Sequence, residues 1–263
     1  NAVKWPPRVG VLIQLTDRFE EDLGQMTALG FSSGQLACEN MELYTGKMQK
    51  RILRATETNG FHITAFYCGW SGYHTYAYPE MYTTLGLVPS YLRDRRVQDI
   101  KKGAEFAEGL GIKCVLSHIG YIPDNPYDLQ YLEIKDCLCG LVGDLSRRGQ
   151  TFLFETGEML PLTLVQLIKV LGDEGVGVNF DPANFLTNGR ANPADALTML
   201  IPYVQGFHAK DGMYPQSGSP KGPEVPLGEG QSDFTALLRI LREHGYAGEL
   251  TIENEMDGPE RIE

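Results

Sequence analysis

The sequence predicts a single (β/α)8 barrel, and three observations support this fold class. Its 263 residues are close to the roughly 250 that such a barrel typically contains. Apolar, β-branched segments alternate with amphipathic ones along the chain, which is typical of a parallel sheet in an α/β protein. Eight of the apolar segments have strand character, which favours closure into a barrel. We expect one domain over residues 1–263, because no linker-like change in composition and no internal repeat divides the chain.

In chain order, the predicted strands cover residues 9–15, 36–43, 62–70, 113–118, 151–155, 177–181, 204–210 and 249–253, the second being weakly marked. The predicted helices cover residues 46–58, 92–110, 129–148, 162–171, 193–200 and 234–244. Prolines at helix starts and glycines at helix ends support these bounds: Pro161, Pro193, Gly111, Gly149, Gly172 and Gly245. Ten residues follow Glu253, so an eighth helix either lies outside this sequence or is absent from the barrel.

The composition narrows the class of function. Hydrophobic residues make up 42% and charged residues 22% of the chain, as in an ordinary globular protein. The net charge of −11 disfavours nucleic acid as a partner, because a phosphate backbone is also negative. The five cysteines are odd in number and irregularly spaced, so we expect no disulfide framework and a cytoplasmic location. Neither a signal peptide nor a long apolar run is evident, so no membrane partner is expected.

Four residues with metal-binding side chains lie at or near the ends of four consecutive predicted strands: Glu155, Asp181, His208 and Glu253. Active sites of this fold are built from the carboxyl ends of the strands. Side chains alternate along a strand, so the apolar neighbours of Glu155 and Glu253 face the helices and the two carboxylates face the barrel axis. Three carboxylates converging on one point repel one another, and a divalent cation relieves that repulsion.

Each of these residues has an ordinary explanation when taken alone. An acid at a strand end commonly caps the following helix, and a histidine in a strand is commonly part of the core. Four of them at four consecutive strand ends are much harder to explain in this way. The sequence therefore predicts one divalent ion, with Mn²⁺, Mg²⁺ or Co²⁺ suited to the mixed oxygen and nitrogen ligands and Zn²⁺ also compatible.

Several motifs around these residues resemble those of the xylose-isomerase-like barrel superfamily, in particular the sugar phosphate isomerase/epimerase group. The resemblance runs from the first predicted strand to Glu253 and is strongest after Phe154. The motifs that carry it are Phe-Glu-Thr-Gly (154–157), Val-Asn-Phe-Asp-Pro-Ala-Asn (178–184), Phe-His-Ala-Lys-Asp-Gly (207–212), Val-Pro-Leu-Gly-Glu-Gly (225–230) and Leu-Thr-Ile-Glu-Asn-Glu (250–255).

The resemblance implies a role for each matching position. The quartet matches the metal ligands of the superfamily, and Glu155 and Glu253 also match the pair that moves a proton in ketose epimerases. His118 matches a pocket histidine. Two positions depart from the pattern: many relatives have histidine where this chain has Asn184, and ketose 3-epimerases have a substrate-binding arginine where it has Tyr214. These departures leave the identity of the sugar open.

Other residues are expected near a substrate on weaker grounds. Lys210 follows His208 by two and projects to the same side, although a surface salt bridge would explain it equally well. Glu158 and Asn184 are placed to hydrogen-bond a sugar, and Trp70 and Tyr73 to form a wall, although helix capping and aromatic packing are the alternatives. Residues 212–232 are rich in glycine and proline, and we expect them to form a loop that folds over the barrel mouth as a lid.

These observations predict a metal-dependent isomerase or epimerase that acts on a sugar, a sugar phosphate or a polyol ketone by proton transfer. A dehydratase of the inosose type would begin with the same proton abstraction and stays an alternative, as does a non-enzymatic sugar-binding barrel. A DNA-repair nuclease of the endonuclease IV type needs more histidines than the five present, so we expect no incision of abasic DNA. A small-molecule sugar is the expected partner, and a homo-oligomer is left open.

Overall fold

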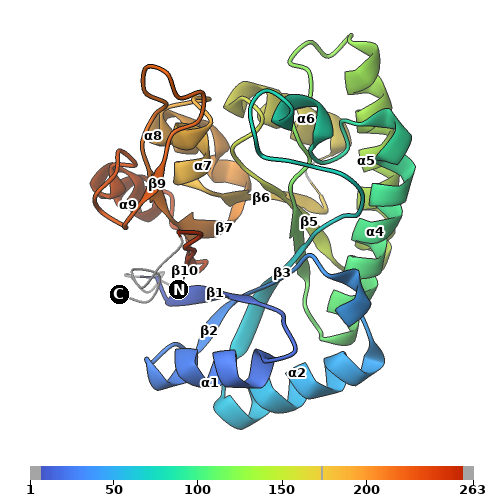
Figure 1. The fold of residues 1–263 in the computed structure, drawn as a ribbon, viewed down its shortest axis with the longest axis vertical. Coiled ribbons are helices and arrows are strands. Elements are labelled where there is room, and N and C mark those ends of the chain that lie inside the picture. The colour runs from blue at the N-terminus through green and yellow to red at the C-terminus, as the bar shows by residue number, and fades with distance from the viewer. Residues whose placement is uncertain (1–6, 173, 257–263) are drawn as a thin grey trace.

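The computed structural model describes residues 7–172 and 174–256, and it confirms the predicted barrel (Figure 1). Eight parallel strands close on one another in the order β1-β10-β7-β6-β5-β4-β3-β2. Their bounds are β1 Val9–Gln14, β2 Ser33–Cys38, β3 His62–Cys68, β4 Cys114–Ser117, β5 Thr151–Glu155, β6 Val176–Phe180, β7 Val204–Ala209 and β10 Leu250–Ile252.

Helices connect the strands and surround the barrel (Figure 1). The long connecting helices are α1 Phe19–Ala28, α2 Gly46–Asn59, α4 Ser90–Gly109, α5 Leu129–Arg147, α6 Pro161–Leu171, α8 Pro193–Leu200 and α9 Phe234–Glu243. Two short helices, α3 Met81–Thr84 and α7 Pro182–Thr187, lie in loops that follow strands. The glycines predicted to end helices all have positive φ, which confirms those bounds.

The alternation of side chains divides the core into an outer and an inner part. Phe152 and Phe154 of β5 belong to the large apolar core between barrel and helices. Leu153, between them in sequence, packs with Ala65 and Leu116 in a small separate cluster. Successive side chains of β5 therefore face opposite sides of the sheet, and the next inward position after Leu153 is Glu155.

The second strand was predicted in the wrong place. It covers Ser33–Cys38 rather than residues 36–43, because Gly34 and Gln35 at its start carry no apolar signal although both are buried. Met41–Leu43, predicted as its end, form a 3₁₀ turn that the Asn40 side chain caps. Helix α1 was not predicted, because its apolar pattern is short and only Phe19 and Leu23 are buried. The eighth helix would fall on residues beyond 256, outside the described part.

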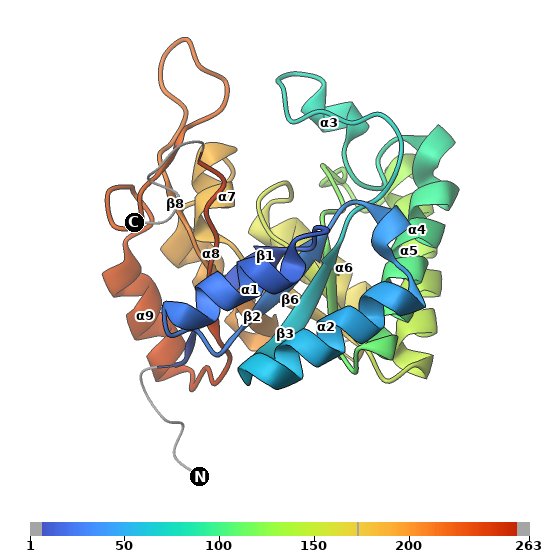
Figure 2. The ribbon, with the colours of Figure 1, turned by 60° about the horizontal axis from the view of Figure 1, so that its bottom comes forward.

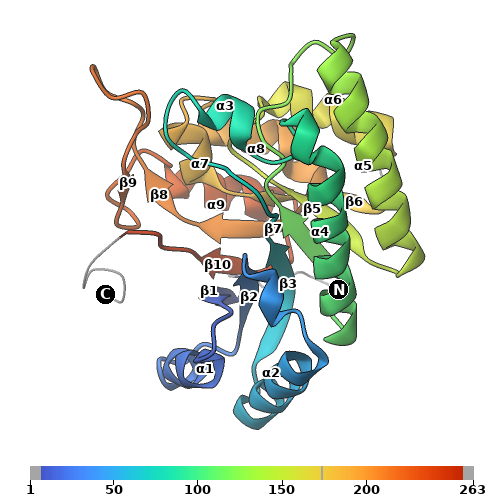
Figure 3. The same ribbon diagram turned by 45° about the vertical axis from the view of Figure 1, so that its right-hand side comes forward.

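Two loops rise at the carboxyl ends of the strands. Figures 2 and 3 show the loop that carries α3 and the long segment after β8 at the same end of the barrel. Residues 212–232 were predicted to lack regular structure, but strands β8 Asp211–Gly212 and β9 Glu224–Val225 pair as an antiparallel hairpin at its base. The sequence missed this pairing because each strand is only two residues long.

A buried carboxylate fastens the base of this hairpin. Asp211 accepts hydrogen bonds from the backbone N–H groups of Gly228 and Gly230 at 3.0 Å and of Ser232 at 3.1 Å. Position 230 must be glycine for this approach, since a Cβ there would lie 2.2 Å from Asp211 Oδ1. The Leu-Gly-Glu-Gly stretch thus has a structural role, which is to wrap the chain around Asp211.

No helix within the described ranges is long and apolar enough to span a bilayer.

Candidate metal centre

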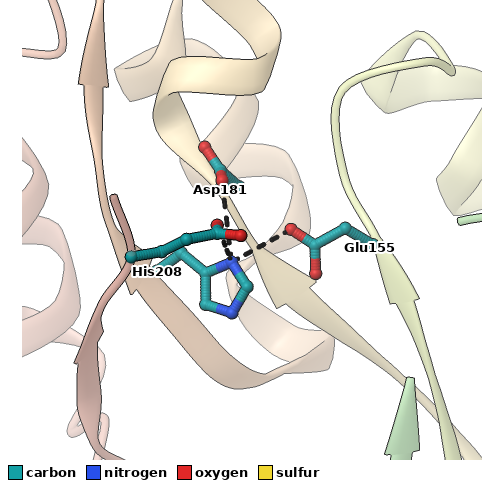
Figure 4. A group of neighbouring side chains, drawn as sticks. Glu155, Asp181 and His208 are labelled. Atoms are coloured by element: carbon teal, nitrogen blue, oxygen red, sulfur yellow. Dashed lines mark ion pairs between the residues drawn. The ribbon is translucent and has the colours of Figure 1, made fainter. Parts of the chain in front are cut away.

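The four predicted strand-end residues meet at the mouth of the barrel. Glu155 is the last residue of β5, and Asp181 directly follows β6. His208 lies near the end of β7, and Glu253 directly follows β10. Glu155, Asp181 and His208 are almost completely buried, at 2% exposure or less. Figure 4 shows the carboxylates of Glu155 and Asp181 turned toward the same nitrogen of the His208 ring.

The distances within this quartet are those of atoms arranged around a point. His208 Nδ1 lies 2.7 Å from Glu253 Oε2, 3.2 Å from Glu155 Oε1 and 3.6 Å from Asp181 Oδ2. One ligand atom from each residue lies within 4.8 Å of all the others. Atoms bound to one ion at about 2.0–2.2 Å lie at most about 4.4 Å apart, so a small contraction brings the four into coordination.

Hydrogen bonding singles out the same four atoms. Glu155 Oε1, Asp181 Oδ2, His208 Nδ1 and Glu253 Oε2 are all buried, and among the described residues none of them makes a hydrogen bond of normal geometry; their polar neighbours are one another and Lys210. The other polar side-chain atoms of three of them are satisfied: Glu155 Oε2 by Asn179, Asp181 Oδ1 by the N–H of Asn184, and His208 Nε2 by Gln35. Buried polar atoms without partners are costly. The residues therefore fit one divalent cation, which would satisfy all four atoms together.

The electrostatics of the quartet agree with this fit. Burial by itself would lower the pKa of His208, but the Glu155 and Glu253 carboxylates outweigh it and raise that pKa well above its usual value. Burial would raise the pKa of Glu253, but Lys210 and His208 outweigh it and hold that pKa well below its usual value. Burial raises the pKa of Asp181, against the opposing effect of Lys210. A proton on the imidazole thus occupies the charge position that a cation would take.

Asp181 has a second task in the local structure. Its Oδ1 caps helix α7 by accepting the N–H of Asn184 at 2.9 Å, so the ordinary explanation of a strand-end acid also holds here. Thr156 Oγ1 accepts the N–H of Asp181 at 2.8 Å, which ties the ends of β5 and β6 together. Gly157 allows the two loops to touch, since a Cβ there would lie 2.3 Å from the Cβ of Asn184. The cap fixes one oxygen and leaves Oδ2 facing the quartet.

A cavity of about 190 Å³ opens beside the quartet. Glu253, Lys210, Asn184, His118 and Glu158 line it, so the structure brings four of the five predicted substrate residues together with one predicted ligand. Its remaining lining residues are Tyr76, Leu85, Tyr121, Asn188, Lys221 and Glu255. None of these was predicted individually, because they lie outside the periodic strand and helix patterns, although Lys221 belongs to the predicted lid and Glu255 to the motif 250–255.

Two ion pairs, His118–Glu158 and Lys210–Glu255, place charged side chains in the lining of the cavity. His118 Nδ1 lies 2.5 Å from Glu158 Oε1, and although burial acts to lower the pKa of His118, Glu158 outweighs it and raises the pKa to about 9. Lys210 Nζ lies 2.6 Å from Glu255 Oε2 and 3.4 Å from Glu253 Oε2. Lys210 does form the salt bridge considered from the sequence, with the 68% exposed Glu255, but the lysine itself is only 4% exposed and lines the cavity rather than the surface. Both side chains present a positive charge to the cavity.

The aromatic residues predicted to form a wall of the cavity, Trp70 and Tyr73, are not among the residues that line it. Trp70 does not line the cavity, because its Nε1 donates to the carbonyl of His118 at 2.9 Å and its ring packs 4.0 Å from the Arg96 guanidinium carbon. Tyr73 is 61% exposed and is not part of the lining either. Tyr76 takes the expected place instead, with its ring 6.2 Å from that of His118. Lys221 of the hairpin segment lies 5.4 Å from the Tyr76 ring and links the two loops at the mouth.

Comparison with known proteins places the fold and the quartet in a family. A family model described as xylose isomerase-like TIM barrel matches residues 24–263. A xylose isomerase domain protein from Planctomyces limnophilus superposes with a TM-score of 0.89 at 28% identity, over 95% of this chain and 89% of that one. A D-tagatose 3-epimerase-like protein superposes with a TM-score of 0.73 at 21% identity, over 97% of this chain and 93% of that one.

A curated relative extends the comparison at the level of sequence. An uncharacterized protein of Methanocaldococcus jannaschii is 25% identical over 177 residues, which are 62% of this chain. The match spans 58% of that relative's length. The family model, in contrast, covers the chain from α1 onward, through every residue of the quartet. The chain belongs to the xylose isomerase-like TIM barrel family.

Proposed function

We propose that this protein is a divalent-metal-dependent isomerase or epimerase of a sugar or a related polyol ketone. One observation carries the proposal: four buried atoms, one from each of Glu155, Asp181, His208 and Glu253, converge at the edge of a polar cavity, and none makes a hydrogen bond of normal geometry in the part of the chain that the structure describes. Membership of the family supports it, as does the likeness to a D-tagatose 3-epimerase-like protein.

The cavity has the chemistry expected of a site for hydroxyl groups. Tyr121 Oη and Glu158 Oε2 are buried and have no hydrogen-bond partner in the described ranges, and both residues line the cavity. Asn184 and Asn188 add amide groups that both donate and accept. A polyol can pair with each of these groups, whereas an apolar ligand would leave them unsatisfied.

In the proposed reaction, Glu155 and Glu253 move the proton. They come from strands separated by β6 and β7 in the barrel, so they approach a bound ketone from different sides. One carboxylate takes the proton from the carbon next to the carbonyl, and the electron pair of that C–H bond moves toward the carbonyl oxygen. The other carboxyl group enters the step protonated, and in an epimerase it returns its proton to the opposite face of the same carbon. In an isomerase it returns the proton to the former carbonyl carbon, while the neighbouring hydroxyl passes its proton to the original carbonyl oxygen and becomes the new carbonyl. The four residues of the quartet would hold a divalent ion, which would supply Lewis-acid polarisation of the carbonyl.

A dehydratase is the second candidate, and the His118–Glu158 pair favours it. With a pKa of about 9, His118 carries a proton at neutral pH and lines the cavity. It is thus placed to protonate a leaving hydroxyl group after the same first step. The product separates the two: an epimer or isomer has the mass of the substrate, whereas dehydration removes one water.

The proposal is tested by solvent exchange. The protein is freed of metal with a chelator, supplied with Mn²⁺ or Mg²⁺, and incubated in D₂O with a panel of ketoses, sugar phosphates and inososes. We expect deuterium to enter at the carbon next to the carbonyl of at least one compound, and NMR identifies the product. The Glu249→Gln variant, changed at the far end of the barrel, should behave like the wild type. Absence of exchange with the whole panel and both ions would contradict the proposal.

A further inference from the structure

A chain of hydrogen bonds lies directly beneath the quartet and joins two of its members. His208 Nε2 lies 3.0 Å from Gln35 Oε1, Gln35 Nε2 donates to Asn179 Oδ1 at 2.9 Å, and Asn179 Nδ2 donates to Glu155 Oε2 at 2.7 Å. All four residues are 2% exposed or less. The two amides therefore connect the imidazole on β7 to the carboxylate on β5, through β2 and β6, inside the barrel.

The carboxylate end fixes the direction of the whole chain. An ionised carboxylate only accepts, so Asn179 must turn its NH₂ group toward Glu155. Its oxygen then faces Gln35, which must in turn donate with its own NH₂ group. Gln35 is left to present its oxygen to His208, and an amide oxygen only accepts. His208 Nε2 must therefore carry a hydrogen, which leaves Nδ1 as the atom available to a cation.

The sequence makes room for these amides with a glycine. Asn179 precedes Asp181 by two residues and Gly206 precedes His208 by two, so both lie on the inward face, one step below the quartet. A Cβ at position 206 would lie 2.1 Å from Asn179 Oδ1 and 3.3 Å from Gln35 Nε2. Any larger residue there would displace the amides from their hydrogen bonds.

We propose that Gln35 and Asn179 are positioning residues, which hold the His208 ring through Nε2 and the Glu155 carboxylate through Oε2 so that Nδ1 and Oε1 face the ion, and that Gly206 provides the space they need. The inference rests on the metal site of the proposed function. Outer partners of metal ligands of this kind typically contribute about 10–100-fold in metal affinity. A role limited to filling the barrel would contribute to stability but not to the geometry of a bound ion.

The test compares Gln35→Met and Asn179→Leu with a matched control, Gln150→Met, in the full chain. Gln150 is also 2% exposed and also uses its amide, donating to the carbonyls of Ala104 and Ile112, away from the quartet. We expect the first two variants to bind Mn²⁺ about 10–100-fold more weakly and to change the visible absorption spectrum of bound Co²⁺. The control should lower the melting temperature while leaving both metal readouts unchanged.

Two further variants keep the test decisive. Gly206→Ala adds only one methyl group, so it can be tested even if the larger changes prevent folding. It should weaken Mn²⁺ binding as well. The double variant Gln35→Met/Asn179→Leu should bind Mn²⁺ no more weakly than whichever single variant binds it less tightly. Either change alone already interrupts the chain of hydrogen bonds. If Gln35→Met and Gly206→Ala both keep wild-type Mn²⁺ affinity and an unchanged Co²⁺ spectrum, this inference is overturned while the proposed function stands. Absence of metal binding by the wild type would overturn the proposed function with it.

Discussion

Both ends of the barrel bury carboxylates, but the two ends differ in whether neighbouring side chains hydrogen-bond the carboxylate oxygens. At the amino end, Glu249 accepts hydrogen bonds from Ser33, Thr64 and Thr251, so both of its oxygens are satisfied. At the carboxyl end, three carboxylates and an imidazole each leave one buried atom that makes no hydrogen bond of normal geometry within the described residues. Burial of an acid therefore does not by itself mark a site. Convergent atoms whose polar neighbours are mainly one another, without well-formed hydrogen bonds among the described residues, distinguish a place for a cation from a structural hydrogen-bond cluster.

The comparison predicts its largest effect in catalysis. Glu253→Gln and Glu155→Gln keep the size and an oxygen donor but remove the basic carboxylate. With metal at saturation, we expect each to lower solvent exchange of the substrate proton by about 10²–10⁴-fold. Solvent deuterium exchange followed by NMR measures this. Glu249→Gln should lose stability, by about 1–3 kcal/mol for a disturbed buried hydrogen-bond cluster, but not exchange. Near wild-type exchange in both quartet variants would leave these acids a purely ligating role.

The next effect concerns metal and stability. A cation that binds only the folded chain adds about 2.7 kcal/mol at a free concentration 100 times its dissociation constant. For a chain of this size we expect the melting temperature to rise by about 5–10 °C. Asp181→Asn should lose most of this rise, whereas Glu249→Gln should retain it. Elemental analysis that finds no ion, as purified and after soaking, together with an unchanged melting temperature, would count against the site.

A smaller effect is expected from the pH dependence of the His118–Glu158 pair. The pKa of His118 is about 9 in the folded chain and about 6.5 when unfolded. Because the pKa of His118 is higher in the folded than in the unfolded chain, the pair contributes its full stabilisation of the folded state below about pH 6.5. This stabilisation is lost as the pH rises through about 9. Glu158→Gln should therefore lower the free energy of unfolding by about 1–3 kcal/mol near pH 6 and by less at higher pH.

Chemical denaturation across this pH range checks the prediction. Glu133→Gln is a suitable control, because it removes the ion pair with Arg93, in which the Glu133 side chain is 59% exposed and no histidine takes part. Its effect should stay constant between these pH values. A loss in Glu158→Gln that is equally constant would show that the pair does not depend on protonation of His118.

The smallest effect is expected in the hairpin segment. We predict that limited proteolysis within residues 215–220 slows when a proven substrate is present, by less than about tenfold, because the base of the segment is already fixed by Asp211. Asp211→Asn should speed the cleavage without substrate. Cleavage at an unchanged rate with substrate bound would argue against a lid.

The sequence predicted most where the signal is local. The quartet could be found because each member ends an apolar strand, and alternation alone turns Glu155 and Glu253 inward. Gln35 and Asn179 could not be found in this way, because their hydrogen bonds join strands that are distant in the chain. Gln35 was also missed because the start of β2 lacks apolar residues. Tyr76 and Lys221 reach the cavity from loops, whose paths depend on tertiary contacts rather than on a repeating pattern.

The anchoring by Asp211 separates the hairpin segment into a neck and a tip with independent requirements. The neck depends on one carboxylate and on glycines at fixed positions, whereas residues 216–220 at the tip are exposed. The tip can therefore change in length or sequence while the barrel chemistry below stays the same. The tip could therefore be replaced with segments of other lengths. Such replacements would change which ligands the mouth of the barrel admits without any change to the quartet.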